Sequence, residues 1–236
     1  MTQLNTLPTI KNEALRDSWE ERALAVFRRA YIAQQRRITP ALLEANRDEI
    51  LSLINQLFVG EPDLVAADVR RFMYELADDV SIAALVEAGV SADPDTLLLT
   101  INRLASETAK RFGGTMTETS QRLVYSITQD WLDTDASTIG ELRNRYTRIW
   151  QGPRPITAAV TETTRLVGDT RIASWQESGL VWGYHVDIRD INTRDSHRAV
   201  SEAGPYRLDD PTGRVPINGD PNCFCTVRPA VENPNA

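Results

Sequence analysis

The chain has 236 residues, of which 42% are hydrophobic and 25% charged, and its formal net charge is −7. This composition is typical of a folded globular protein and excludes a largely disordered chain. The acidic balance also excludes a protein that coats nucleic acid with its whole surface, because phosphate binding depends on clustered Lys and Arg.

No stretch approaches the roughly 18 uninterrupted apolar residues of a membrane-spanning helix, so we expect no membrane partner. The first residues lack the basic start and apolar run of a secretory signal. We therefore expect the chain to remain in the cytoplasm or in an assembly built there.

The first part of the chain predicts helices joined by short connections. Apolar residues recur at helical spacing over residues 12–37. Thr39 followed by Pro40 predicts the start of a second helix, which we expect to end at Gly60. A third helix is expected from Pro62. The apolar residues expected on one side of it are Leu64, Phe72, Met73, Leu76 and Val80.

A second cap-and-proline pair, Asp93-Pro94, predicts the start of the next helix. The pair Gly113-Gly114 is expected to end it. Amphipathic stretches over residues 123–131 and 139–149 predict two more helices.

The segment QGPRP, residues 151–155, breaks helical structure and predicts a domain boundary. A further helix is expected over residues 156–177, closed by Gly179. Alternating apolar residues over 180–188 predict a half-buried strand. A short helical turn is expected around RDSHRAV (194–200), and CFCTV (223–227) is expected as the last strand.

The predicted fold class is therefore mostly α. A helical N-terminal part, residues 1–151, is expected to supply docking and assembly surfaces. A small α+β domain, residues 152–236, is expected to follow it.

Cys223 and Cys225 are the only cysteines and stand one residue apart. A disulfide is the poorest interpretation, because neighbouring side chains of an extended segment point to opposite faces. The pair could instead supply zinc ligands together with His197, because thiolate and imidazole suit tetrahedral zinc. It could also fill a small core. Candidates for a fourth zinc ligand are His185, Asp190 and Asp195.

A Cys–His pair near an aspartate is also the minimum for nucleophilic catalysis. Asp190, Asp195 and His197 could alternatively bind a hard metal for phosphodiester cleavage. Neither arrangement is accompanied by a phosphate-binding glycine loop or a hydrolase motif. We therefore expect no catalytic residues and no required cofactor, with structural zinc as the open alternative.

One ordered pattern spans the C-terminal part. Its pieces, in chain order, are TETTR (161–165), Gly179, Trp182, an aspartate, TRDSH (193–197) and PNCFC (221–225). The set resembles the C-terminal domain of phage Mu protein F-like minor head proteins, also called phage head morphogenesis proteins. The resemblance covers roughly residues 154–229, about a third of the chain.

The sequence departs from the family pattern in several places. The glycine expected shortly after the histidine is delayed to Gly204, and Phe224 replaces the arginine between the two cysteines. Asp187 and Asp190 both remain candidates for the family aspartate. Some relatives carry cysteine where this chain has Arg194, which cannot bind zinc.

The resemblance implies a structural minor head protein of a tailed phage or prophage, active in capsid assembly near the portal. It implies a portal or major capsid protein as partner and packaged double-stranded DNA as a neighbour. The expected location is the virion, in the capsid interior or at the portal vertex, after assembly in the host cytoplasm. Two alternatives are a head–tail adaptor and a DNA-acting or toxin-like hydrolase that uses His197 with aspartates or cysteines.

The polar residues of the pattern favour a structural interpretation. We expect Arg165 and Arg194 to pair with Glu162 or with an aspartate of the same domain. With Trp182 and Asp190, these residues would staple a small, loop-rich domain together.

Arg22, Arg29 and Arg36 recur every seven residues and so align along one side of the first helix, with Arg28 and Arg37 nearby. This stripe could face DNA phosphates or an acidic partner surface. The alternative is a solvated helix face balanced by Glu20 and Glu21.

Overall fold

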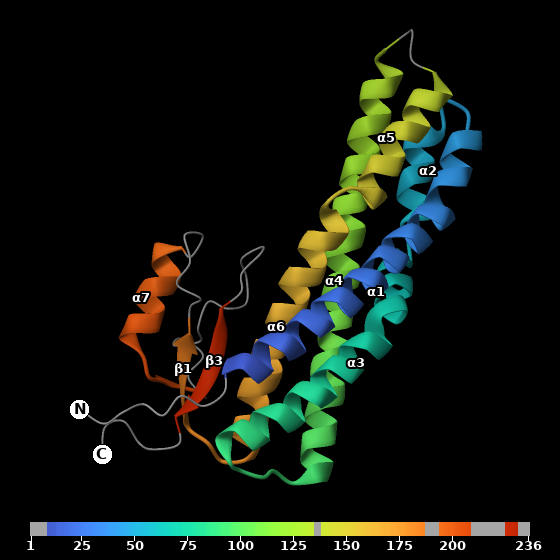
Figure 1. The fold of residues 1–236 in the computed structure, drawn as a ribbon. Helices are drawn as coiled ribbons and strands as arrows, with labels where there is room; N and C mark the ends of the chain where they lie inside the picture. The colour runs from blue at the N-terminus through green and yellow to red at the C-terminus, as the bar shows by residue number, and fades with distance from the viewer. Residues whose placement is uncertain (1–8, 135–137, 187–193, 209–224, 231–236) are drawn as a thin grey trace.

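The computed structural model describes residues 9–134, 138–186, 194–208 and 225–230. Its elements are α1 (Thr9–Glu44), α2 (Ile50–Leu57), α3 (Glu61–Ala88), α4 (Pro94–Leu132), α5 (Ile139–Gln151), α6 (Arg154–Glu177), β1 (Trp182–Val186), α7 (Asp195–Ala203), β2 (Tyr206–Arg207) and β3 (Thr226–Ala230). Helices α1–α6 form an elongated bundle, which we name the helical body, and the strands with α7 form the C-terminal unit beside one end of it (Figure 1). The predicted mostly α fold with a small α+β C-terminal part is confirmed.

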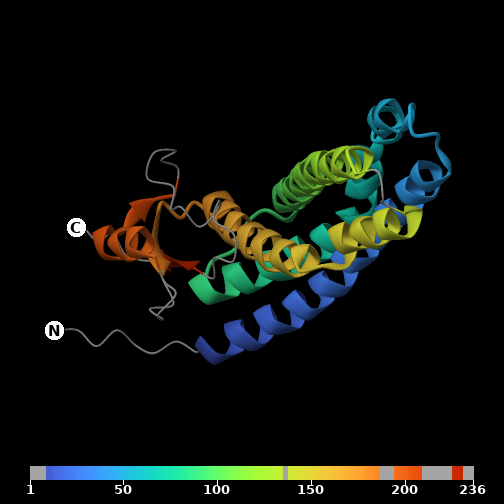
Figure 2. The ribbon, with the colours of Figure 1, turned by 90° about the horizontal axis from the view of Figure 1, so that it is seen from above.

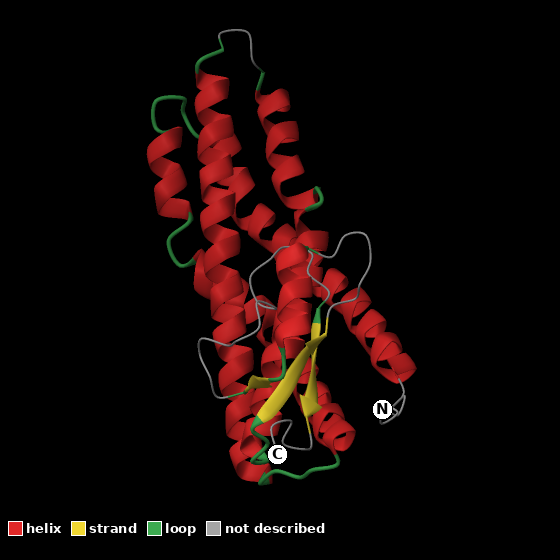
Figure 3. Ribbon diagram, turned by 90° about the vertical axis from the view of Figure 1, so that its left-hand side faces the viewer, coloured by secondary structure: helices red, strands yellow, loops and turns green. Residues whose placement is uncertain are grey.

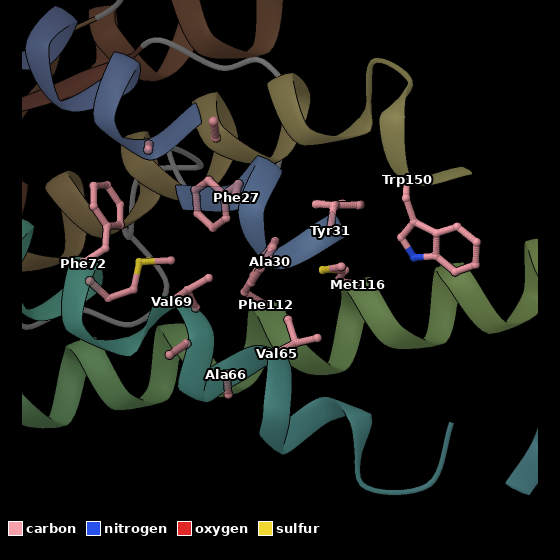
Figure 4. Packing of buried hydrophobic residues seen from close by; sticks show 14 of the residues in the cluster. Phe27, Ala30, Tyr31, Val65, Ala66, Val69, Phe72, Phe112, Met116 and Trp150 are labelled. Carbon is pink, nitrogen blue, oxygen red and sulfur yellow. The ribbon is translucent and has the colours of Figure 1, made fainter. Parts of the chain in front are cut away.

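One apolar core runs along the helical body and draws on α1 to α6. Phe27 of α1 lies at its centre, with its ring 4.6 Å from that of Phe112 and 6.0 Å from that of Phe72 (Figure 4). Trp150 of α5 is also fully buried, and its indole Nε1 donates to Gln34 Oε1 at 3.0 Å. The helical spacing of apolar residues in the sequence therefore corresponds to one continuous core.

Caps fix where several helices begin. Asp93 accepts a hydrogen bond from the Thr96 backbone N–H at 2.9 Å, which confirms the predicted start of α4. Thr138 and Glu141 form a reciprocal capping box at the start of α5. Gly179, at φ +83°, follows the last turn of α6 as expected.

The helix start predicted at Thr39 and Pro40 is wrong, because α1 continues through both residues to Glu44. Ile38 and Leu42 are buried in the main core on either side of the proline. Packing of this face holds the helix together despite the backbone donor that proline lacks.

The helix end predicted at Gly113 and Gly114 is also wrong, because α4 continues to Leu132. A Cβ atom on Gly113 would lie 2.2 Å from the carbonyl oxygen of Pro62 on α3. The glycine therefore permits close packing of α3 against α4 rather than ending a helix.

Two smaller predictions need correction. Leu64, expected on the packed side of α3, is 49% exposed. The last strand begins at Thr226, with buried Cys225 immediately before it, instead of running over 223–227. The structure does not describe residues 223 and 224.

The three strands form an antiparallel sheet in the order β2-β1-β3 (Figure 3). Trp182 of β1 is opposite Ala230 of β3 and Arg207 of β2. The strand predicted over residues 180–188 is present as β1, which begins at Trp182. Gly183 has no room for a side chain, since a Cβ would lie 2.7 Å from Leu208 Cδ2.

Helix α6 contacts both the helical body and the sheet. It contributes Ala159 and Leu166 to the main core and, nearer its end, Ile172 and Trp175 to a second core. Figure 2 shows the C-terminal unit beside the end of α6. The break at residues 151–155 separates α5 from α6, and the division into domains 1–151 and 152–236 stays a prediction.

No single helix in the described ranges is long and apolar enough to cross a membrane. The bent pair formed by α2 and α3 meets that length and composition test when the two helices are taken together.

Candidate functional site

The candidate site is the junction at which the C-terminal unit meets α6 and the end of α3. Its best-defined polar contact joins His197 of α7 to Cys225, which lies just before β3. His197 Nδ1 is 3.2 Å from Cys225 Sγ, and both side chains are buried. The pair therefore links helix α7 to the last strand.

Cys225 is not part of a disulfide, in agreement with the low rank given to that interpretation. It packs in the second core with Ile172, Trp175 and Val227. This matches the interpretation of Cys225 as a small core residue with a histidine partner. Cys223 lies outside the described residues.

Zinc needs four ligands in a structural site. His197 and Cys225 supply two neighbouring ones, but within the described ranges no group of three His, Cys, Asp or Glu side chains could hold a metal ion. Asp195 is exposed at the start of α7 and does not complete the set. Zinc binding therefore stays a prediction.

Several other predicted ligands and motif residues are not described. Asp187 and Asp190 lie outside the described ranges. His185 is opposite Val227 in the β1–β3 register, but its side chain is not among those described. The choice between the two aspartates thus stays open.

Glu162, in the middle of α6, is a buried carboxylate held by two arginines. Its Oε2 accepts from Arg111 of α4 at 3.2 Å, and its Oε1 accepts from Arg165 at 3.5 Å. The predicted pairing of Arg165 with Glu162 is confirmed. Arg111 was missed because it lies on another helix, 51 residues earlier in the chain.

Arg194 and Trp182 have roles at element ends. Arg194 is the N-cap residue of α7, and its carbonyl oxygen accepts from the backbone N–H groups of His197 and Arg198. Its side chain is exposed and makes no capping bond. Trp182 is half-buried, with the Arg207 guanidinium 5.8 Å from its ring.

A further set of contacts at this junction, which no local motif predicted, joins α6 to α3. The buried Arg171 guanidinium pairs with Glu87 and lies 5.3 Å from the Trp175 ring. Trp175 Nε1 donates to the carbonyl oxygen of Ala84 at 2.9 Å. Burial lowers the pKa of Arg171, and the charge of Glu87 opposes that effect. We name Glu87, Arg171 and Trp175 the α3–α6 clamp.

The ends of α3 and α6 are built alike. In α6, the Gly179 N–H donates to the carbonyl of Gln176 and the Leu180 N–H to that of Trp175. Gly89 and Val90 make the same pair of bonds at the end of α3. Leu180 and Val90 both pack on the second core, so these helix ends help to form the platform for the sheet. Gly89 and Gly179 are the sequence signal from which these two helix ends could be predicted.

The three arginines of the predicted stripe on α1 have different surroundings in the structure. Arg22 lies over the Trp19 ring at 3.9 Å and pairs with Glu75 of α3 at 2.8 Å. Arg22 therefore joins α1 to α3. Arg29 and Arg36 are exposed, and neither forms an ion pair with any described residue.

No protein-family model, curated protein or solved structure matches this chain.

Proposed function

We propose that the chain is a structural minor head protein of a tailed phage or prophage, acting in head assembly near the portal. Its partner would be the portal protein or the major capsid protein. The proposal rests first on the ordered resemblance that runs from TETTR to PNCFC.

The observation that carries the proposal is that the described residues of the pattern form contacts within the protein. Glu162 and Arg165 pair within α6, and Glu162 also binds Arg111 of α4. His197 and Cys225 join α7 to the start of β3. The Glu162–Arg111 and His197–Cys225 contacts connect separate parts of the chain, which is the use that a structural role requires.

The direct test is to isolate procapsids from the host of the phage or prophage and count copies of this chain by quantitative mass spectrometry. The proposal predicts reproducible incorporation that is lost when the portal gene is deleted. A portal gene immediately upstream is also expected. Absence of the chain from procapsids that contain portal would overturn the proposal.

The same preparation separates the two alternatives. A head–tail adaptor would form a twelvefold ring at the portal, visible by microscopy. A hydrolase would lose turnover in a folded His197→Ala or Cys225→Ala variant. Either result would replace the proposed function.

Zinc is tested by elemental analysis of the purified full chain. One zinc per chain, lost in both Cys225→Ser and Cys223→Ser variants, would assign the metal to the two cysteines. Absence of stoichiometric zinc would contradict the hypothesis of a structural zinc site.

A further inference from the structure

Two segments of this acidic protein contain no acidic residue. Residues 22–43 include five arginines and residues 142–161 include four, and neither segment has an Asp or Glu. The first segment forms most of α1, and the second covers residues 142–151 of α5 and the start of α6. In a chain of net charge −7, this is a strong local separation of charge.

The fold brings these two segments side by side. Gln35 of α1 donates to Thr147 Oγ1 of α5 at 3.5 Å and accepts from Gln151 Nε2 at 3.0 Å. One residue earlier, Gln34 accepts from Trp150 at 3.0 Å. The seam between α1 and α5 is therefore neutral and polar, with arginines near it on both helices.

Three of the nine arginines are bound to other groups of the protein. Arg22 pairs with Glu75, and Arg37 binds the Glu61 carboxylate through two bonds of 2.8 and 3.0 Å. Arg154 is partly buried and donates to Ser120 and to the carbonyl oxygens of Ile149 and Met116.

The other six arginines are exposed, and none forms an ion pair within the described part of the chain. We name them the arginine face: Arg28, Arg29, Arg36, Arg143, Arg145 and Arg148. Arg28 and Arg36 are eight residues apart on α1, a rise of about 12 Å along the helix axis. The two neighbouring helices thus carry several exposed cations along a length that spans several phosphates of a duplex.

The arginine face lacks the side chains on which protein interfaces and single-strand binding depend. No large apolar side chain is exposed among the described side chains of α1. Two are exposed nearby, Ile139 at the first residue of α5 and Ile156 near the start of α6. Protein interfaces take most of their affinity from buried aromatic and apolar anchors. Single-stranded nucleic acid stacks its bases on exposed aromatic rings, whereas Tyr31, Tyr146 and Trp150 are all buried. A duplex needs only cations for its phosphates.

We propose that the arginine face binds the phosphate backbone of double-stranded DNA without sequence preference. Identifying that duplex as packaged phage DNA rests on the proposed function, whereas the binding itself does not. The acidic remainder of the surface repels a polyanion, so the duplex is expected to approach through this face alone.

The test measures binding of the purified full chain to a fluorescent duplex of mixed sequence across a salt series. The variant Arg29→Gln/Arg36→Gln/Arg148→Gln removes three cations from the face. The control Arg70→Gln/Arg103→Gln/Lys110→Gln removes three exposed cations from α3 and α4. Both variants change the net charge equally, and their thermal unfolding is compared with that of the wild type.

The wild type is expected to bind with a steep salt dependence. The face variant is expected to bind on the order of 100-fold more weakly at low salt and to reduce the slope of log K against log salt by about 3. The control is expected to change affinity only a few-fold. Absence of duplex binding at low salt, or equal losses in both variants, would overturn the proposal.

Two competitors check the class of partner. Unlabelled duplex, polyglutamate and single-stranded DNA are compared at equal charge for their ability to displace the fluorescent duplex. The assignment to double-stranded DNA would be overturned if polyglutamate or the single strand displaced it more strongly than the unlabelled duplex does. Incorporation into procapsids is scored separately. A face variant that enters procapsids but does not bind DNA supports both proposals, whereas wild type that binds DNA but never enters procapsids contradicts the proposed function alone.

Discussion

The helical body and the C-terminal unit are held together in different ways. The body buries a long apolar core that draws on six helices. The C-terminal unit has a much smaller core, and four of its seven buried members are supplied by α3 and α6: Ala84, Ala88, Ile172 and Trp175. The unit therefore depends on a platform provided by the body.

Polar contacts compensate for that small core. The α3–α6 clamp fixes the platform, and Gln176 Nε2 donates to the Leu208 carbonyl at 2.6 Å. The Tyr206 hydroxyl donates to the Val200 carbonyl at 2.6 Å. In the body, burial of apolar surface stabilises the fold, whereas in the C-terminal unit removal of one polar partner should have a large local effect.

The largest effect is expected for Trp175→Ala, which removes the central ring of the second core and its bond to Ala84. We expect the opening free energy of the C-terminal unit to fall by about 3–5 kcal/mol. Amide hydrogen exchange in β1 and β3 measures that opening. Trp150→Ala is the matched control, because it should lower protection throughout the helical body. If both variants lost hydrogen-exchange protection in the same elements, the C-terminal unit and the helical body would not be stabilised in different ways.

Glu87→Gln leaves the buried Arg171 guanidinium without its anionic partner. We expect the free energy of unfolding to fall by about 3 kcal/mol, because an uncompensated buried charge is strongly unfavourable. Urea unfolding measures the change. Neutralising the exposed Arg103–Glu107 pair by Glu107→Gln should cost less than about 1 kcal/mol. Similar losses of unfolding free energy in the two variants would show that the Glu87–Arg171 pair stabilises the protein no more than an exposed ion pair does.

Adjacent glycines of α4 test how closely the body is packed. Gly113→Ala should destabilise the protein by about 1–3 kcal/mol, because its Cβ would meet the Pro62 carbonyl. Gly114 has nothing within 4 Å of such a Cβ. Gly114→Ala should therefore stabilise the helix by about 0.5–1 kcal/mol. Thermal unfolding of both variants measures the difference, and equal shifts would contradict the packing of α3 on α4.

One further effect concerns the core of the body and is seen only at alkaline pH. Burial raises the pKa of Tyr146 to about 12, although its hydrogen bond with Thr128 opposes the shift. The folded state thus retains the phenolic proton more strongly than the unfolded state. This contribution is complete below about pH 10 and is lost as pH rises toward 12, by at most about 2–3 kcal/mol.

The Tyr146 contribution is measured as the difference in unfolding free energy between wild type and Tyr146→Phe over that pH range. The difference should shrink or reverse as pH rises. A difference that stays constant would show that Tyr146 titrates normally.

Local sequence signals predicted the helices well where caps or periodic apolar residues define them, as at Asp93 and over residues 139–149. They failed at Pro40 and Gly113, where packing between helices overrides local preference. The same limit applied to the site. The pair Glu162–Arg165 is local and was predicted, but Glu87 and Arg171 are 84 residues apart and carry no shared motif.

The arginine stripe shows the same limit in a functional prediction. Seven-residue spacing places Arg22, Arg29 and Arg36 along one side of α1. Only the tertiary fold reveals that Arg22 is paired with Glu75 and that α5 adds three exposed arginines beside α1.

The central claim is that the motif residues act as structural contacts of the C-terminal unit. It is tested most directly by hydrogen exchange of the full chain in His197→Asn and Cys225→Ser variants, with Ser196→Ala, at an exposed position of α7, as the control. We predict faster exchange in β1, β3 and α7, unchanged exchange in α1 to α5, and no effect of the control. The claim would be contradicted if both variants kept the exchange rates of the wild type in every element and lost a hydrolase activity that the wild type has.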